Sequence, residues 1–222
     1  MKIWNIFLIE RGILEGDFNR KLLQRRAFNP ILTRGDFSQK GSFIMPSASP
    51  QKRLYTIDNI YALPEGSRAE LIDGQIYYMA PPIRTHQQLI HLFERTIGNY
   101  IQTNGGKCEV YPAPFAVYPD QDDLNYLKPD ISIICDPSKL DEKGCHGAPD
   151  WVIEIASESS RRTDYAINLF KYRSAGVREY WIVDPLKQRN TVYSFEHDTM
   201  DEYSFEEEIP VGIYEGFCVK LR

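Results

Sequence analysis

Two acidic residues border or interrupt strongly apolar segments. Asp130 comes directly before the apolar run 131–134, and Glu154 stands inside the apolar run 151–156. A carboxylate inside a buried strand costs free energy unless it is paired or bound to a metal ion. If the two strands are neighbours in one sheet, both carboxylates can reach a single hard divalent cation, which takes oxygen ligands. The pattern therefore raises the hypothesis of a metal site.

A purely structural role for Glu154 is the alternative. Arg161 and Arg173 follow it closely in the chain, and either could neutralise its charge. Because buried pairs of glutamate and arginine are common, spacing alone favours such an ion pair over a metal site.

The elements that must position these acids alternate between helices and strands. The sequence predicts a short helix capped by Thr56, a hairpin that turns at Asp73-Gly74, and a helix that is capped by Thr85 and ends at Gly105-Gly106. The later expected elements are strands at 108–111, 115–118, 131–135 and 151–156, a helix at 163–175, a strand at 179–183, and edge strands around 191–195, 202–205 and 217–221. We therefore expect a mixed α/β domain in which one helix crosses over between central strands.

The order of these motifs resembles the PD-(D/E)XK nuclease superfamily, in which Pro-Asp is followed by a glutamate in a strand and then by a helix. More closely, residues from about 55 to 192 resemble the Uma family of restriction endonuclease-like proteins. The segments that carry the resemblance are Glu70-Leu71-Ile72-Asp73-Gly74, His86, Pro129-Asp130, Val152-Ile153-Glu154-Ile155, Asp164, Tyr172, Gly176-Val177 and Glu179-Tyr180-Trp181-Ile182-Val183-Asp184. The resemblance implies a restriction-endonuclease-like mixed central sheet flanked by helices, with extra edge strands, and a nuclease that cuts DNA with Mg²⁺ or Mn²⁺.

The resemblance also implies roles for individual residues. Asp130 and Glu154 would be the metal-binding acids, Glu70 would complete the cluster, and the backbone carbonyl of Ile155 would be a further ligand. The cation would polarise a phosphate oxygen and lower the pKa of a bound water molecule. His86, at the start of its helix, would contact that water or a phosphate; the alternative is a surface or packing histidine.

The expected lysine is missing. Ala156 stands two residues after Glu154, and the position at which the Uma family carries its lysine is occupied by Asn168. Lys171 lies three positions further along the same helix, and its long side chain could reach the same phosphate; otherwise it is a solvated surface residue.

Two functions follow: a metal-dependent endonuclease, or a catalytically weak nuclease-fold protein that acts as a nucleic-acid-binding or interaction module.

A basic segment lies beside the proposed site. Residues 161–178 contain five basic residues and one acidic residue. Such a patch could contact the DNA backbone, or its charges could be satisfied by neighbouring acids. Nucleases that cut both strands commonly pair two sites by two-fold symmetry, so a homodimer is a further expectation.

Composition excludes several classes of protein. With 26 basic and 31 acidic residues among 222, the formal charge is −5, which is unlike a histone-like polycation. Hydrophobic residues make up 42% and charged residues 26%, values typical of a folded domain and not of a disordered chain. Apolar runs stay shorter than the roughly 18 residues of a membrane span, so we expect a cytoplasmic protein without a membrane partner.

The cysteines and the N-terminal region complete the expectations. Cys108, Cys135, Cys145 and Cys218 form no CxxC pair, so we expect reduced thiols. We expect residues 1–50 to form a poorly structured basic leader and linker, and residues 51–222 to form the nuclease-like domain. One hypothesis is that Met45 is the natural start and that an over-extended reading frame supplies residues 1–44.

Overall fold

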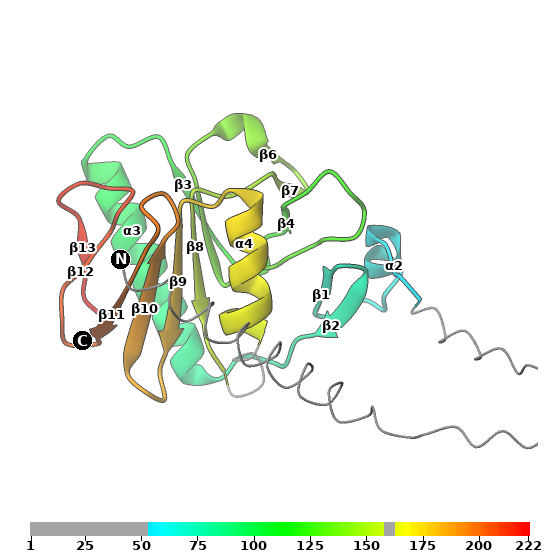
Figure 1. Cartoon of the computed structure of the whole chain (residues 1–222), viewed down its shortest axis with the longest axis horizontal. Helices are drawn as coiled ribbons and strands as arrows, with labels where there is room; N and C mark the ends of the chain where they lie inside the picture. Colours follow the sequence, from blue (N-terminus) through cyan, green and yellow to red (C-terminus); the bar gives the residue numbers. More distant parts are fainter. Residues whose placement is uncertain (1–52, 158–162) are drawn as a thin grey trace, which may run out of the picture. The chain divides into compact units, whose positions relative to one another are not determined.

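The computed structural model describes residues 53–157 and 163–222 (Figure 1). The chain divides into two units, Met1–Ser49 and Pro50–Arg222, and the account below concerns the second unit. The expectations of a basic leader and of a start at Met45 concern residues outside the described part of the chain.

A six-stranded mixed sheet forms the centre of this unit. Its strand order is β11-β10-β9-β8-β5-β3. Neighbouring strands run antiparallel except β8 and β9, which are parallel and are joined by the crossover that contains helix α4. The strands are β3 (Glu109–Pro112), β5 (Ile131–Ile134), β8 (Trp151–Ile155), β9 (Glu179–Asp184), β10 (Arg189–Ser194) and β11 (Thr199–Ser204). The expected mixed α/β arrangement is confirmed.

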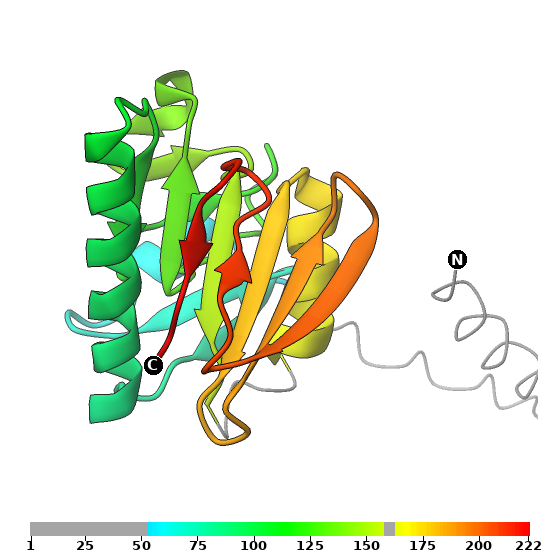
Figure 2. The same ribbon diagram turned by 90° about the vertical axis from the view of Figure 1, so that its left-hand side faces the viewer.

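The two faces of the sheet are covered by different elements, because side chains alternate along each strand. Helix α3 (Arg84–Thr103) covers one face, and Phe93 in α3 packs edge-on against Trp181 of β9, with ring centroids 6.1 Å apart. Helix α4 (Leu169–Ala175) covers the other face, where Tyr172 is buried. Figure 2 shows the two helices on opposite sides of the sheet. The central strands β5, β8 and β9 are buried along their whole length, as their apolar sequences predict.

The predicted N-terminal elements form, but one helix begins earlier than predicted. Helix α2 (Ile57–Tyr61) begins after Thr56, and strands β1 (Ala69–Ile72) and β2 (Gln75–Tyr78) flank a turn at Asp73-Gly74, where both residues have positive φ. Helix α3, however, begins at Arg84, so the prediction that Thr85 caps it is wrong. The extended residue Ile83 precedes the helix, and its carbonyl already accepts the first helical hydrogen bond, from the Gln87 N–H.

Two small sheets accompany the central one, and of their strands only β4 and β13 fall within predicted strands, those at 115–118 and 217–221. One has the order β4-β7-β6, and the other pairs β12 with β13. The strands that were not predicted, β6, β7 and β12, are only two or three residues long, too short for a period of two to be recognised in the sequence. These elements are β4 (Val117–Tyr118), a 3-10 turn η1 (Pro137–Lys139), β6 (Leu140–Asp141), β7 (Gly144–His146), β12 (Ile209–Pro210) and β13 (Cys218–Val219).

The helix predicted at 163–175 has two parts. Residues Thr163–Asn168 form a π-helical segment, η2, and α4 continues from Leu169 to Ala175. Gly176 ends α4 in the left-handed conformation, with φ of 95°, as the sequence predicts. Short π-helical segments are frequent at functional sites. Asn168, the position that replaces the expected lysine, lies at the junction of the two parts.

The expectation of four reduced thiols is wrong for one pair. Cys108 and Cys135 form a disulfide, whereas Cys145 and Cys218 are free. The register of β3 and β5, which pairs Glu109 with Ile134, brings the two cysteines opposite each other at the end of the ladder. A separation of 27 residues in the sequence cannot reveal this cross-strand register.

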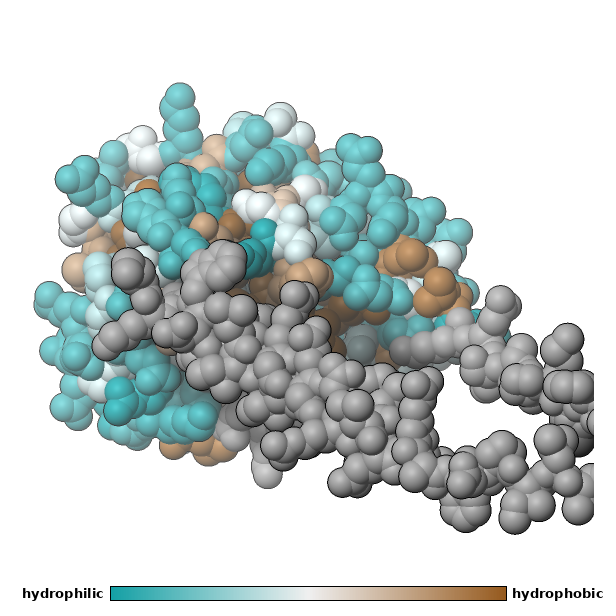
Figure 3. All heavy atoms as spheres, viewed as in Figure 1, coloured by the Kyte–Doolittle hydropathy of each residue, from teal (hydrophilic) through white to brown (hydrophobic). Residues whose placement is uncertain are grey.

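The surface of the described residues is mostly hydrophilic on the face shown in Figure 3. Large exposed hydrophobic residues occur among them, which is normal for a folded domain. They are Leu54, Tyr61, Tyr78, Ile83, Phe170, Leu186 and Met200. Among the helices of residues 53–157 and 163–222, none combines the length and apolar character that crossing a membrane requires.

Candidate active site

Glu154 is buried in strand β8 on the face covered by α4. Its neighbours Ile153 and Ile155 pack on the α3 side, so the alternation of the strand directs Glu154 the other way. Tyr172 donates its hydroxyl hydrogen to Glu154 Oε1 (2.9 Å), and Asn168 Nδ2 lies 3.5 Å from the same oxygen. Glu154 therefore contacts both α4 and the end of η2.

Asp130 lies beside Glu154 because β5 and β8 are neighbours, as the metal hypothesis required. The register pairs Ile131 with Ile153, and the Asp130 N–H lies 3.3 Å from Glu154 Oε2. In turn, Asp130 Oδ2 accepts a hydrogen bond from the Ile155 N–H (2.8 Å) and lies 3.0 Å from His86 Nε2. The sequence-predicted residues Asp130, Glu154, Ile155 and His86 are thus brought together.

Glu70 enters the same region from strand β1. Its Oε1 accepts a hydrogen bond from the Lys128 N–H (2.7 Å), two residues before Asp130. Burial, reinforced by the charge of Asp130 and opposed by the bond and charge of Lys128, raises the pKa of Glu70 to about 7. Burial, together with the charges of Glu154 and Glu70, also raises the pKa of Tyr172 well above its ordinary value. Glu70 is therefore close enough to Asp130 for their charges to interact, and both Glu70 and Glu154 lie near Tyr172.

The side chains of the candidate site offer oxygen atoms, the type of ligand that a hard divalent cation prefers. Glu70, Asp130 and Glu154 are only 7%, 6% and 6% exposed, and mutual repulsion among carboxylates is what a bound cation relieves. Within the described residues, Asn168 Oδ1 is a further buried oxygen without a hydrogen-bond partner. Across residues 53–157 and 163–222, no group of three or more His, Cys, Asp or Glu side chains is gathered as a metal cage. Backbone N–H groups instead occupy one oxygen of each acid.

The structure also shows where the three residues related to the missing lysine lie. Asn168 faces Glu154, where the resemblance places a lysine, and Ala156 is buried on the same face of β8. Lys171 Nζ lies 2.5 Å from Asp73 Oδ1 in the β1–β2 turn. The ammonium of Lys171 is thus held by the hairpin. Separately, the backbone carbonyl of Ile155 stays a predicted metal ligand.

The cations of the basic segment are paired with acids wherever they are described. Besides Lys171, Arg173 pairs with Asp198, and Arg178 pairs with Glu196 and Asp150. These contacts favour the interpretation of satisfied surface charges over that of a DNA-binding patch. They also remove Arg173 as the expected partner of Glu154, whereas Arg161 lies outside the described residues.

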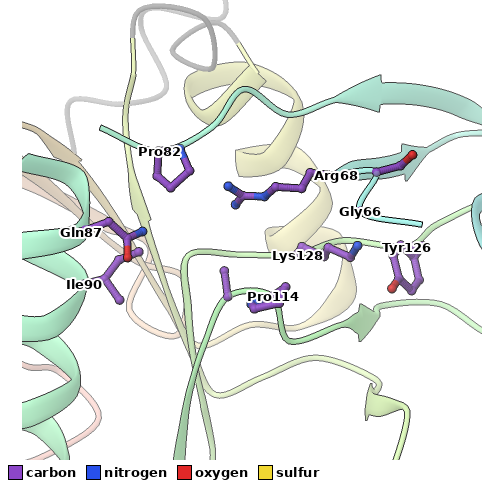
Figure 4. A pocket seen from close by; sticks show the side chains of 10 residues that line it. Gly66, Arg68, Pro82, Gln87, Ile90, Pro114, Tyr126 and Lys128 are labelled. Carbon is purple, nitrogen blue, oxygen red and sulfur yellow. The ribbon is translucent and has the colours of Figure 1, made fainter. Parts of the chain in front are cut away.

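Sequence reasoning missed a pair of basic residues beside the acids, Arg68 and Lys128. They line a pocket of about 470 Å³ (Figure 4). Burial lowers the pKa of Lys128, an effect that Glu70 opposes and Arg68 reinforces. The available signal was the spacing, because each basic residue precedes a predicted site acid by two positions, Glu70 in one case and Asp130 in the other.

Comparisons with known proteins identify a family and a fold. A family model described as "Uma2: Putative restriction endonuclease" matches residues 57–217. Among solved structures, the chain is similar to the crystal structure of a putative nuclease belonging to DUF820 from Anabaena variabilis ATCC 29413. The sequence identity is 22%, the TM-score is 0.62, and the match covers 75% of this chain and 94% of that chain. No curated protein matches the chain. The structural similarity confirms the predicted restriction-endonuclease-like fold.

Proposed function

The chain belongs to the Uma2 family of putative restriction endonucleases, and from this premise we propose that it hydrolyses DNA phosphodiester bonds in a reaction that depends on Mg²⁺ or Mn²⁺. The observation that carries the proposal is that the buried acids Asp130 and Glu154 are hydrogen-bonded neighbours at adjacent strands, while buried Glu70 lies near enough to Asp130 for that charge to raise its pKa. When bound, the cation would supply a polarised phosphate oxygen and a water molecule of lowered pKa.

In this proposal the three acids hold the cation, and the Ile155 carbonyl is an additional ligand. The neighbouring residues Tyr172 and Asn168 position Glu154 through their contacts with Oε1. Tyr172 is suited to this role because its raised pKa keeps the hydroxyl protonated, so that it can donate to the carboxylate.

His86 is proposed to move a proton. An ionised Asp130 can only accept a hydrogen bond, so the contact of 3.0 Å assigns the hydrogen to His86 Nε2. In the neutral imidazole, Nδ1 is then an acceptor; it is buried and has no hydrogen-bond partner among the described residues. An imidazole oriented in this way by a carboxylate can take a proton from an attacking water molecule.

A second candidate function is a nuclease-fold protein that binds nucleic acid and cuts weakly or not at all. The observation that favours it is the neutral Asn168 at the expected lysine position, together with the pairing of Lys171 with Asp73. Without a cation there, the negative charge on the attacked phosphate would be stabilised less.

Plasmid nicking in Mg²⁺ or Mn²⁺ tests the two functions. We expect the unaltered chain to nick, Glu154→Gln to abolish nicking, and the exposed control Glu215→Gln to cut like the parent. Cutting by Asn168→Lys alone would favour the binding module. Absence of cutting by both the parent and Asn168→Lys would contradict the proposed activity.

The proposal includes a homodimer, because two symmetry-related sites can cut both strands of a duplex. Gel filtration with light scattering would give twice the chain mass of 25.8 kDa. A monomer at all concentrations would remove the dimer from the proposal and leave the single-strand nicking reaction intact.

A further inference from the structure

A pocket opens beside the acid cluster, and its walls are both apolar and basic. Its volume of about 470 Å³ lies in the range of small-molecule sites. Figure 4 shows Arg68 and Lys128 among the side chains that line it, with Gln87 and Ile90 contributed by helix α3. Pro82, Pro114 and Tyr126 add apolar surface. The pocket could therefore take a group with an anionic part and an apolar part.

The two cations of this pocket have no ion-pair partner among the residues that the structure describes. Among residues 53–157 and 163–222, neither Arg68 nor Lys128 forms an ion pair, whereas Arg173 and Arg178 do. Lys128 Nζ lies 5.1 Å from the centroid of the Tyr126 ring. Glu70 accepts from the backbone of Lys128 and leaves its ammonium available. Two half-buried cations, neither of them in an ion-pair contact with an acid of the described residues, suit the binding of an anion.

The pocket lies next to the acids because residues that line it are close in sequence to proposed catalytic residues. Each of three segments carries one pocket residue and one proposed catalytic residue close together: Arg68 with Glu70, Gln87 with His86, and Lys128 with Asp130. A ligand in the pocket would consequently lie next to the site proposed for hydrolysis.

We propose that the Arg68–Lys128 pocket binds a phosphate of the DNA strand, with the attached nucleoside against the apolar wall, so that a neighbouring phosphodiester reaches the three acids. Arginine binds phosphate through two parallel hydrogen bonds, and lysine binds it as a point charge. The pocket has room for more than a phosphate alone, and Tyr126 and the prolines suit a sugar or a base. This inference rests on the proposed function, because it names DNA as the ligand.

Binding without cleavage tests this inference. The full chain would be titrated into a fluorescein-labelled DNA oligonucleotide in EDTA, and fluorescence anisotropy would give the affinity at several salt concentrations. We expect Arg68→Gln and Lys128→Gln each to weaken binding about tenfold near 0.1 M salt, and the double variant to reduce the slope of log K against log salt by roughly one phosphate contact.

The matched control is Arg173→Gln, which removes an exposed, ion-paired arginine and should leave the affinity unchanged. Circular dichroism checks that each variant is folded. If the double variant does not fold, the single variants carry the test. Equal binding by the parent and the folded pocket variants, or absence of binding by the parent, overturns the inference. Binding that depends on Arg68 and Lys128 in a chain that never nicks plasmid would support the pocket and refute only the proposed hydrolysis.

Discussion

The two faces of strand β8 differ in what they require of their neighbours. Towards α3, β8 presents Trp151, Ile153 and Ile155 to a continuous apolar core. Towards α4, the buried acid Glu154 is flanked by Val152 of the same strand and by Ala156, the residue directly after the strand. Burial of an acid opposes folding, whereas burial of an isoleucine favours it. We infer that the α3 face supplies stability and that the α4 face uses part of that stability to hold a reactive group.

The largest expected effect comes from breaking the α3 face. Phe93→Ala removes a fully buried ring that packs on Trp181, and we expect a loss of about 3 to 5 kcal/mol in the free energy of unfolding. Urea unfolding followed by tryptophan fluorescence measures it. The matched control is Phe170→Ala, a phenylalanine that is 69% exposed on α4 and whose loss should change stability little. Similar losses for both variants would contradict the burial of the Phe93 ring in the core on the α3 face.

The next effect concerns the pH dependence of stability in the absence of metal. Because the pKa of Glu70 is raised to about 7 in the folded chain, the folded state keeps a proton that the unfolded state releases near pH 4.5. Stability should therefore fall as pH rises from 4.5 through 7, by roughly 3 kcal/mol at most from this group. Thermal unfolding in EDTA at several pH values, compared with Glu70→Gln, isolates the contribution. Parallel pH profiles for the two chains would show that Glu70 does not titrate in this way.

A smaller effect is expected from the tyrosine that contacts Glu154. Tyr172→Phe removes one hydrogen bond to Oε1 and leaves the ring in the core, so stability should change by about 1 kcal/mol. If Tyr172 positions Glu154, the cleavage rate should fall about tenfold, and the concentration of Mn²⁺ that gives half the maximal rate should rise. The matched control is Tyr193→Phe, on β10. An unchanged rate and metal dependence would leave Tyr172 a packing residue.

The smallest effect is expected at Lys171. Its ammonium is held by Asp73 in the hairpin turn, so Lys171→Ala should change the cleavage rate less than twofold and cost about 1 kcal/mol or less of stability. Asp73→Asn should act in the same way, because it breaks the same pair. A large loss of rate in Lys171→Ala alone would restore Lys171 as the substitute for the missing lysine.

The sequence was informative where a pattern is local. The apolar runs around Asp130 and Glu154 predicted central strands, and Asp73-Gly74 predicted a tight turn, because both signals depend on a few consecutive residues. The predicted cap of α3 was two residues too late: threonine is a common cap, but the residue whose carbonyl accepts the first helical hydrogen bond is Ile83, not Thr85.

Features that depend on cross-strand register were beyond reach of the sequence. The disulfide of Cys108 with Cys135 follows from the β3–β5 register, which no spacing reveals. The contact of Lys128 with Glu70 likewise joins residues 58 positions apart. The apolar runs singled out Asp130 and Glu154, whereas only the family resemblance supplied Glu70, because a single acid in a short hairpin strand has no distinctive local pattern.

Titration of the metal-free full chain with Mn²⁺, followed by electron paramagnetic resonance and isothermal calorimetry, tests the central claim most directly. We predict one saturable ion per chain, lost or strongly weakened in Glu154→Gln and in Asp130→Asn, and retained in Glu215→Gln. Absence of a saturable ion, or equal binding by the parent and both acid variants, would contradict a metal site formed by these acids.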